Sequence, residues 1–237
     1  MDAPRTGRSA AFLFVLLLAS PAAAQMLPGI GGEDARRVVP DPAASPFNSL
    51  ARVQTELGGR CTGALIGPAT VLTAAHCLVS PRSRRMVQPG SVHVLLGYRM
   101  GSWVATSRVA RYETGAWTVA AHGPTAGDWA VLTLETPLAG PVLPILPMPP
   151  VGTPVMLAGY QQDRPEVLLA TIGCHIVTSG AVLVHDCAAT RGASGAPLLA
   201  QGADGAWGIA GIAVSMAADR PIGLAVAATV ARTAAKD

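Results

Sequence analysis

Short runs of apolar and β-branched residues, separated by glycine and proline, recur along the chain after residue 48. Runs of four to eight such residues predict β-strands, because helices of globular proteins need longer periodic segments. The expected strands are Ser49–Gln54, Thr62–Ile66, Thr70–Ala74, Ser91–Leu96, Ala130–Leu134, Pro154–Gly159, Ile172–Ser179, Ala196–Ala200 and Trp207–Val214. The pattern therefore indicates an all-β chain, either a sandwich or a barrel.

Two segments depart from this pattern. The alanine-rich end of the chain, Leu224–Ala235, has the composition of a helix. A proline-rich stretch runs from Pro137 to Pro154. Because repeated proline blocks both helices and central strands, we expect this stretch to cross between two halves, residues 38–140 and 141–237.

The first 24 residues have the three parts of a secretory signal peptide. Arg5 and Arg8 precede the apolar run Ala10 to Ala19, and three alanines at 22–24 stand before Gln25. We expect cleavage after Ala24. The run is too short to span a bilayer, and no other segment reaches about 18 uninterrupted apolar residues. The sequence therefore predicts a secreted or periplasmic protein without membrane contact once the signal is removed.

The composition of the chain limits the classes of molecule that it is expected to bind. Charged residues make up 13% of the chain and the net charge is +3, which is too small and too dispersed to favour nucleic acid. We expect the cluster Arg82-Ser83-Arg84-Arg85 to be a solvated loop. The sequence contains no metal-binding, nucleotide-binding or phosphate-binding motif. We therefore expect a monomer without metal or cofactor.

Three polar residues lie in motifs that indicate chemistry. Ser194 lies in Thr-Arg-Gly-Ala-Ser-Gly-Ala-Pro at 190–197, and His76 ends Val-Leu-Thr-Ala-Ala-His at 71–76. A serine hydroxyl is a poor nucleophile at neutral pH until a base such as imidazole takes its proton. Asp128, at the start of an apolar run, is the best candidate for the carboxylate that orients the imidazole. The set predicts acyl-transfer chemistry through a covalent intermediate.

With these motifs the chain resembles the chymotrypsin-like serine peptidases, especially the secreted bacterial branch that includes the glutamyl endopeptidases. The motifs are Thr-Ala-Ala-His-Cys around His76, Asp-Trp-Ala-Val-Leu around Asp128 and Gly-Ala-Ser-Gly-Ala-Pro around Ser194. The resemblance extends from about Val38 to the C-terminus. It implies a serine endopeptidase that cleaves protein or peptide substrates through an acyl-enzyme.

The resemblance also implies the architecture. Two six-stranded β-barrels would pack together, followed by a short C-terminal helix. His76 and Asp128 would lie on the first barrel, residues 38–140, and Ser194 on the second, residues 141–237. The substrate cleft would lie between the barrels.

Around Ser194, the resemblance implies an oxyanion hole and a specificity pocket. The backbone N–H groups of Gly192 and Ser194 would bind the oxyanion. The pocket would be lined by Ala188, Ala189, Thr190, Ala213, Val214 and Ser215. Glutamate-selective relatives use a histidine and a threonine where this chain has Ala213 and Ala189, so we expect a preference for small or medium apolar side chains. An acidic preference stays open, because Arg191 is expected at the rim of the cleft.

The four cysteines, Cys61, Cys77, Cys174 and Cys187, permit three full pairings, and the sequence itself does not choose among them. The resemblance favours Cys61–Cys77, beside the strand that leads to His76, and leaves Cys174–Cys187 as the second pair. Loops of roughly 15 residues would each contribute on the order of 3 kcal/mol in the chain-entropy model.

Arg36-Arg37 is a basic pair that we expect to be exposed, and residues 25–37 are a possible pro-segment. Relatives activated in this way bury the new amino group against an aspartate immediately before the nucleophile. This chain has Ala193 at that position. Three alternatives stay open: a constitutively shaped enzyme, a different partner for the new N-terminus, or a plain linker.

Two other classes of protein are alternatives to a peptidase. A serine esterase of the α/β-hydrolase type needs Gly-x-Ser-x-Gly and the order Ser, Asp, His, whereas this chain has Ala196 at the last glycine and the opposite order. A non-catalytic binding protein that retains the peptidase fold is the remaining alternative. The other histidines are expected to be structural: His93 on a strand surface, His122 in a loop, and His175 and His185 on neighbouring strands.

Overall fold

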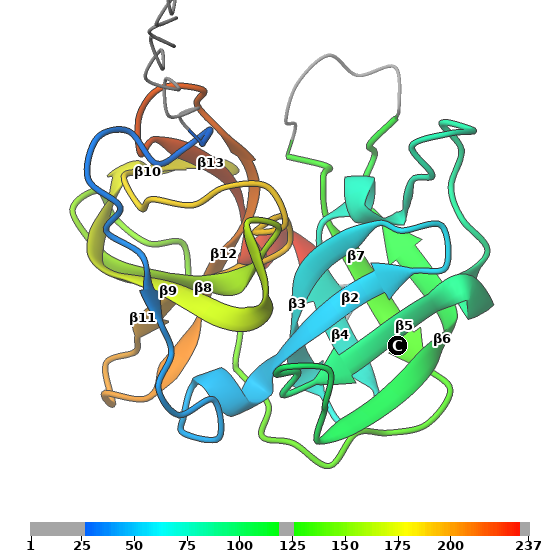
Figure 1. Cartoon of the computed structure of the whole chain (residues 1–237). Coiled ribbons are helices and arrows are strands. Elements are labelled where there is room, and N and C mark those ends of the chain that lie inside the picture. The colour runs from blue at the N-terminus through cyan, green and yellow to red at the C-terminus, as the bar shows by residue number, and fades with distance from the viewer. Residues whose placement is uncertain (1–26, 119–125, 233–237) are drawn as a thin grey trace, which may run out of the picture.

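The computed structural model describes residues 27–118 and 126–232, which fold into two β-barrels lying side by side (Figure 1). The signal peptide expected over residues 1–24 and the loop residue His122 lie outside the described residues. Within these two ranges, none of the helices is both long enough and apolar enough to cross a membrane.

The first barrel is closed and antiparallel, with strand order β2-β3-β4-β7-β6-β5. Its strands are β2 (Leu50–Thr55), β3 (Arg60–Gly67), β4 (Thr70–Thr73), β5 (Val92–Leu96), β6 (Ala105–Thr114) and β7 (Ala130–Leu134). Branched and long aliphatic side chains such as Val53, Val94 and Leu132 point inward and are almost fully buried. Because alternate residues of a strand point to opposite faces, the apolar positions fill the barrel interior.

The second barrel is also closed by six antiparallel strands, in the order β8-β9-β10-β13-β12-β11 with β11 pairing back to β8. The strands are β8 (Pro154–Gln161), β9 (Arg164–Thr178), β10 (Val182–His185), β11 (Pro197–Gln201), β12 (Trp207–Met216) and β13 (Gly223–Ala227). Much of its core is alanine, including Ala196, Ala200, Ala210 and Ala225. The alanine content of the chain therefore belongs in part to a β-barrel core. The two six-stranded barrels that the resemblance implied are confirmed.

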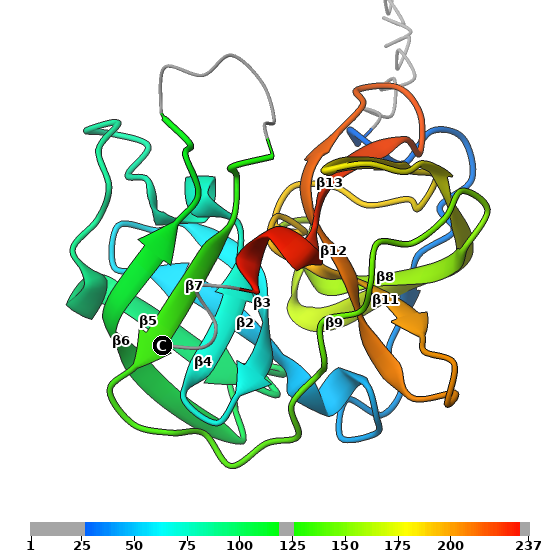
Figure 2. The ribbon, with the colours of Figure 1, turned by 180° about the vertical axis from the view of Figure 1, so that it is seen from behind.

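The helix expected over Leu224–Ala235 is wrong for its first residues. Leu224–Ala227 belong to strand β13, which pairs with β10 on one side and β12 on the other. Only Ala228–Ala231 form a helix, a 3-10 turn that Figure 2 shows between the barrels, and residues 233–235 lie outside the described residues. Burial between two partner strands overrides the helical propensity of alanine.

The barrels are connected by the proline-rich stretch, which leads from β7 to β8 without regular strands. The chain before β2 attaches to the second barrel, because β1 (Arg37–Val38) pairs with Leu169 and Ala170 of β9. Residues near Val38 were expected to open the first barrel. The N-terminal segment is instead an outer strand of the barrel that carries Ser194.

Candidate active site

His76 and Asp128 come from adjacent strands of the first barrel. Strands β4 and β7 pair antiparallel, with Thr73 opposite Ala130. His76 lies in a 3-10 turn just after β4, and Asp128 lies just before β7. Because the end of one antiparallel strand meets the start of the other, the two side chains come to the same edge of the barrel.

The Asp128 carboxylate contacts His76 twice. Its Oδ2 atom lies 2.8 Å from the ring Nδ1, and its Oδ1 accepts the backbone N–H of His76 at 3.0 Å. The Asp128 side chain is 4% exposed, whereas that of His76 is 29% exposed. The carboxylate therefore fixes both the backbone and the ring of His76, and the other ring nitrogen, Nε2, forms no hydrogen bond with Asp128.

Ser194 lies in a tight turn before β11, where the second barrel meets the first. Its carbonyl accepts the N–H of Thr62 from β3 at 2.9 Å. A Cβ atom on the next residue, Gly195, would lie 2.2 Å from Thr73 Oγ1 and 2.3 Å from the Thr62 carbonyl. Only glycine allows this approach, so the turn docks directly on the end of the strand that leads to His76. Among the described residues, no hydrogen bond joins Ser194 to His76; the direct bond is the one between His76 and Asp128.

The turn before β11 contains the amides of Gly192 and Ser194, which were expected to form an oxyanion hole. Gly192 has φ +93°, a conformation that side-chain-bearing residues rarely adopt. The amides of Ala193 and Gly195 donate to Thr190 and Ala213, but within residues 27–118 and 126–232 the amides of Gly192 and Ser194 donate to nothing. Two unpaired N–H groups beside a serine are the donors that a developing oxyanion needs.

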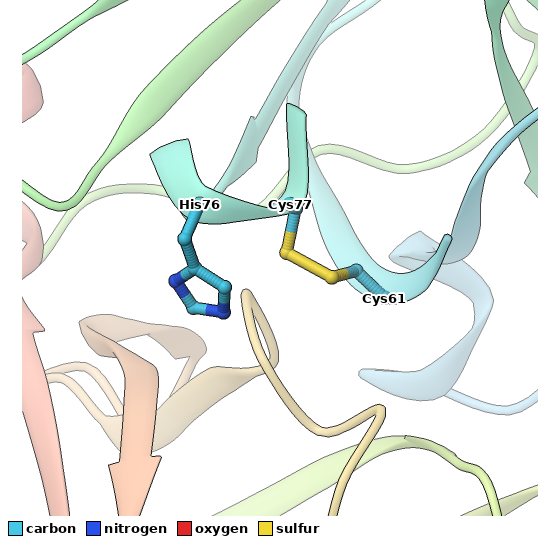
Figure 3. A group of neighbouring side chains, drawn as sticks. All are labelled: Cys61, His76 and Cys77. Carbon is cyan, nitrogen blue, oxygen red and sulfur yellow. A yellow bond between two sulfur atoms is a disulfide. The ribbon is translucent and has the colours of Figure 1, made fainter. Parts of the chain in front are cut away.

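Both expected disulfides are confirmed. Cys61 is bonded to Cys77, and Cys174 to Cys187. Figure 3 shows the first bond next to the His76 ring, tying the start of β3 to the turn that carries the histidine. Although two cysteines and a histidine cluster here, the sulfurs are bonded to each other and neither is a thiolate, which is the form that binds a metal.

A cavity of about 370 Å³ opens beside Ser194. It is lined by Pro28, Thr190, Arg191, Ala193, Ser194, Ala213, Val214, Ser215, Met216 and Ala218. Four of the six residues expected in the pocket, Thr190 and Ala213 to Ser215, line it. Ala188 and Ala189 do not: both are buried, and Ala189 packs in the core of the second barrel.

Sequence reasoning missed the part of the cavity wall that Pro28 forms. The neighbouring Gly29 accepts the N–H of Ala189 at 3.2 Å, and a Cβ on Gly29 would lie 2.0 Å from the Ala189 carbonyl oxygen. Gly29 has φ +79°. The only local signal was the glycine itself, because its partner lies far along the chain.

The expectation of an exposed basic pair is wrong for Arg36, which is 2% exposed, although Arg37 is exposed. The Arg36 guanidinium forms ion pairs with Asp34 at 2.9 Å and Asp163 at 2.8 Å. Burial disfavours the charge of Arg36, but the two carboxylates outweigh it and hold its pKa above the usual value. Hydrogen bonding from Arg36 lowers the pKa of Asp34.

The remaining described histidines lie outside the site. His93 is half-buried on β5, and His175 and His185 lie on the neighbouring strands β9 and β10, as expected. His185 is fully buried, its Nδ1 accepts the Cys187 N–H at 3.3 Å, and its Nε2 has no partner among the described residues. Burial lowers the pKa of His185 to about 4.

Comparison with known proteins agrees with this geometry. The model of a family described as "Trypsin-like peptidase domain" matches residues 61–207. The chain is 30% identical over 144 residues to a glutamyl endopeptidase of Bacillus licheniformis. The aligned region covers 57% of this chain but only 42% of the relative. A solved structure of a Glu endopeptidase in complex with MPD superposes with a TM-score of 0.72 at 22% identity, over 86% of this chain and 96% of that one, and so shows the same fold. Because the family model spans more than half of its residues, the chain belongs to the trypsin-like peptidase family.

Proposed function

We propose that this chain is an exported serine endopeptidase that uses Ser194, His76 and Asp128. The observation that carries the proposal is the 2.8 Å contact between His76 Nδ1 and the buried Asp128 carboxylate, at the edge of the barrel on which the Ser194 turn docks. Family membership and the relationship to a glutamyl endopeptidase support the same reaction class.

The geometry supports a two-step mechanism. Ser194 Oγ attacks the scissile carbonyl while His76 Nε2 takes its proton, and Asp128 holds the ring and stabilises its charged form. The oxyanion of the tetrahedral intermediate accepts hydrogen bonds from the Gly192 and Ser194 amides. His76 then returns the proton to the leaving amine. Water hydrolyses the resulting acyl-enzyme by the same steps in reverse.

The cavity lining supports a small or medium apolar substrate side chain. Ala213, Val214 and Met216 present apolar surface, and none of the described lining residues is acidic. One observation favours acidic substrates as the second candidate: Arg191 is exposed and is the charged residue in the lining. The name of the Bacillus licheniformis relative, a glutamyl endopeptidase, points the same way.

Export is supported by two independent features. The N-terminal residues have the pattern of a secretory signal. All four cysteines are paired in disulfides, which form and persist in oxidising compartments.

The deciding experiment is digestion of a diverse peptide library by the purified protein, with Ser194→Ala as the control and cut sites read by mass spectrometry. We expect cuts that disappear in the variant, and the residue before each cut will report the pocket preference. Labelling by a fluorophosphonate probe should depend on Ser194 in the same way. A folded wild-type protein that neither cuts nor labels would indicate a binding protein that retains the peptidase fold.

A further inference from the structure

Gln161, the last residue of β8, joins the N-terminal segment to the turn before the nucleophile. The side chain is buried, and the residue is 1% exposed. Its Oε1 atom accepts the backbone N–H of Thr190 at 2.8 Å and also the Nη1 of Arg36 at 2.8 Å. One buried oxygen therefore connects Arg36 to the residue two positions before Gly192.

Arg36 is held rigidly on its other sides. Its Nε and Nη2 donate to the two oxygens of Asp34, each at 2.9 Å. Its Nη1 and Nη2 donate to the two oxygens of Asp163 at 2.9 and 2.8 Å. Paired forks of this kind fix the plane of the guanidinium, and a buried charge satisfied in this way has little freedom to turn. The donor that faces Gln161 is therefore fixed in position.

The hairpin formed by β8 and β9 also contacts the rest of the turn before Ser194. The N–H of Gln162 donates to the Arg191 carbonyl at 2.8 Å. A Cβ on Gly192 would lie 2.8 Å from the carbonyl oxygen of Tyr160 and 3.0 Å from the Gln162 nitrogen. Residues 190–192 thus rest on the end of β8 and the start of the connection to β9. Two side-chain hydrogen bonds hold the turn among the described residues: the Thr190 N–H donates to Gln161, and the Thr62 hydroxyl donates to the Gly192 carbonyl at 3.2 Å.

We propose that Gln161 and Arg36 are positioning residues for the Gly192 amide, so that the N-terminal segment supports the oxyanion site through one buried hydrogen-bonded chain. The inference rests on the proposed function, because the Gly192 amide matters only if an oxyanion forms. Hydrogen-bond donors stabilise a transition state only when they are placed in advance, and small displacements of such groups cost rate. Ala193 carries no carboxylate that could hold the turn, whereas Thr190 is held by the buried Gln161 oxygen.

The test replaces Gln161 with methionine, which keeps the length of the side chain but removes the acceptor. We expect kcat to fall about tenfold with KM changed less than about twofold, because the lost interaction acts on the transition state. Gln161→Glu, which keeps an acceptor oxygen, should restore kcat to within about threefold of wild type. The matched control is Gln162→Met, the same change at the adjacent, exposed position, and it should leave kcat unchanged.

A second measurement does not depend on activity. Amide hydrogen exchange of the peptide that covers residues 190–194 should be faster in Gln161→Met than in wild type and unchanged in Gln162→Met. Arg36→Met should show the same local effect if it folds, and Arg36→Lys should show less. Unchanged exchange at 190–194 in folded Gln161→Met would overturn the inference whatever the activity. Faster exchange in a protein whose wild type cuts no peptide would sink the proposed function and leave the support of the turn standing.

Discussion

At the scale of single residues, the site depends on glycines that allow backbone segments to approach closely. Gly195 lets the Ser194 turn meet the end of β4, and Gly192 lets the same turn rest closely on residues 160–162. Both residues have positive φ values. The close contacts at the Cβ position of Gly195 cross the barrel junction and those of Gly192 lie within the second barrel, and the Gly-x-Ser-Gly motif reveals neither.

Gly192→Ala should lower kcat by about 10²- to 10³-fold, the cost of losing one oxyanion donor. The new methyl group would collide with the Tyr160 carbonyl at 2.8 Å and move the amide. Steady-state kinetics with a peptide substrate would measure the loss. Gly205→Ala is the control, because Gly205 also has a positive φ, +77°, but nothing lies within 4 Å of its Cβ position. Both variants should lose some thermal stability, and an equal loss of kcat in both would contradict the assignment.

At the scale of elements, the alternation of apolar residues predicted most strands, and the errors have physical causes. Strand β6 was not predicted, because its exposed positions carry threonine, arginine and alanine and only Ser107 and Val109 are buried. The end of the chain was given a helix because alanine favours helices in isolation. Residues 224–227 instead pair with β10 on one side and β12 on the other, and no local sequence pattern contains that information.

The two disulfides offer a comparison at this scale. Removing either pair by double substitution to alanine should cost about 3 kcal/mol of unfolding free energy, because the spans of 16 and 13 residues are similar. Denaturant unfolding would measure this loss of unfolding free energy.

The kinetics of the two disulfide variants should differ. Loss of Cys61–Cys77 frees the turn that carries His76 and should lower kcat. Loss of Cys174–Cys187, which ties β9 to the segment leading into the cavity, should act mainly on KM. Identical kinetic changes in the two variants would show that the bridges act on stability alone.

At the scale of the whole molecule, the site lies where two separately closed barrels meet. The triad candidates could be named from motifs because each motif is local, whereas the two disulfide pairs were implied by the resemblance, since the cysteines alone left three pairings open. The burial of Arg36 could not be inferred from the sequence, because its partner Gln161 is 125 positions away. Pro28 in the cavity wall was missed for the same reason. Contacts that close over such distances depend on the packed fold.

The stability of the whole fold should depend on pH through His185. Its pKa is about 4 in the folded chain and 6.5 when exposed, so the unfolded chain binds the proton more readily between these values. The contribution of neutral His185 to the free energy of unfolding is fully present above about pH 6.5. It is lost as the pH falls toward 4, and the total loss is about 3 kcal/mol. Denaturant unfolding at several pH values would measure it. His185→Asn should flatten this dependence, whereas His175→Asn, at a half-exposed position on β9, should not. An unchanged slope in His185→Asn would rule out His185 as the source.

The hold on the N-terminal segment changes what proteolysis near Arg37 would accomplish. Arg36 is clamped by two carboxylates, Gly29 is bonded to Ala189, and β1 lies along β9. A cut after Arg37 would sever the chain without freeing the piece, so the nicked protein would run as one species in native chromatography and as two after denaturation, without reduction, because both disulfides lie after the cut. After such a break, the same non-covalent contacts would keep the two new chain ends on the folded molecule. Conversion of a precursor by loss of this piece would need a second event that disrupts the arginine clamp.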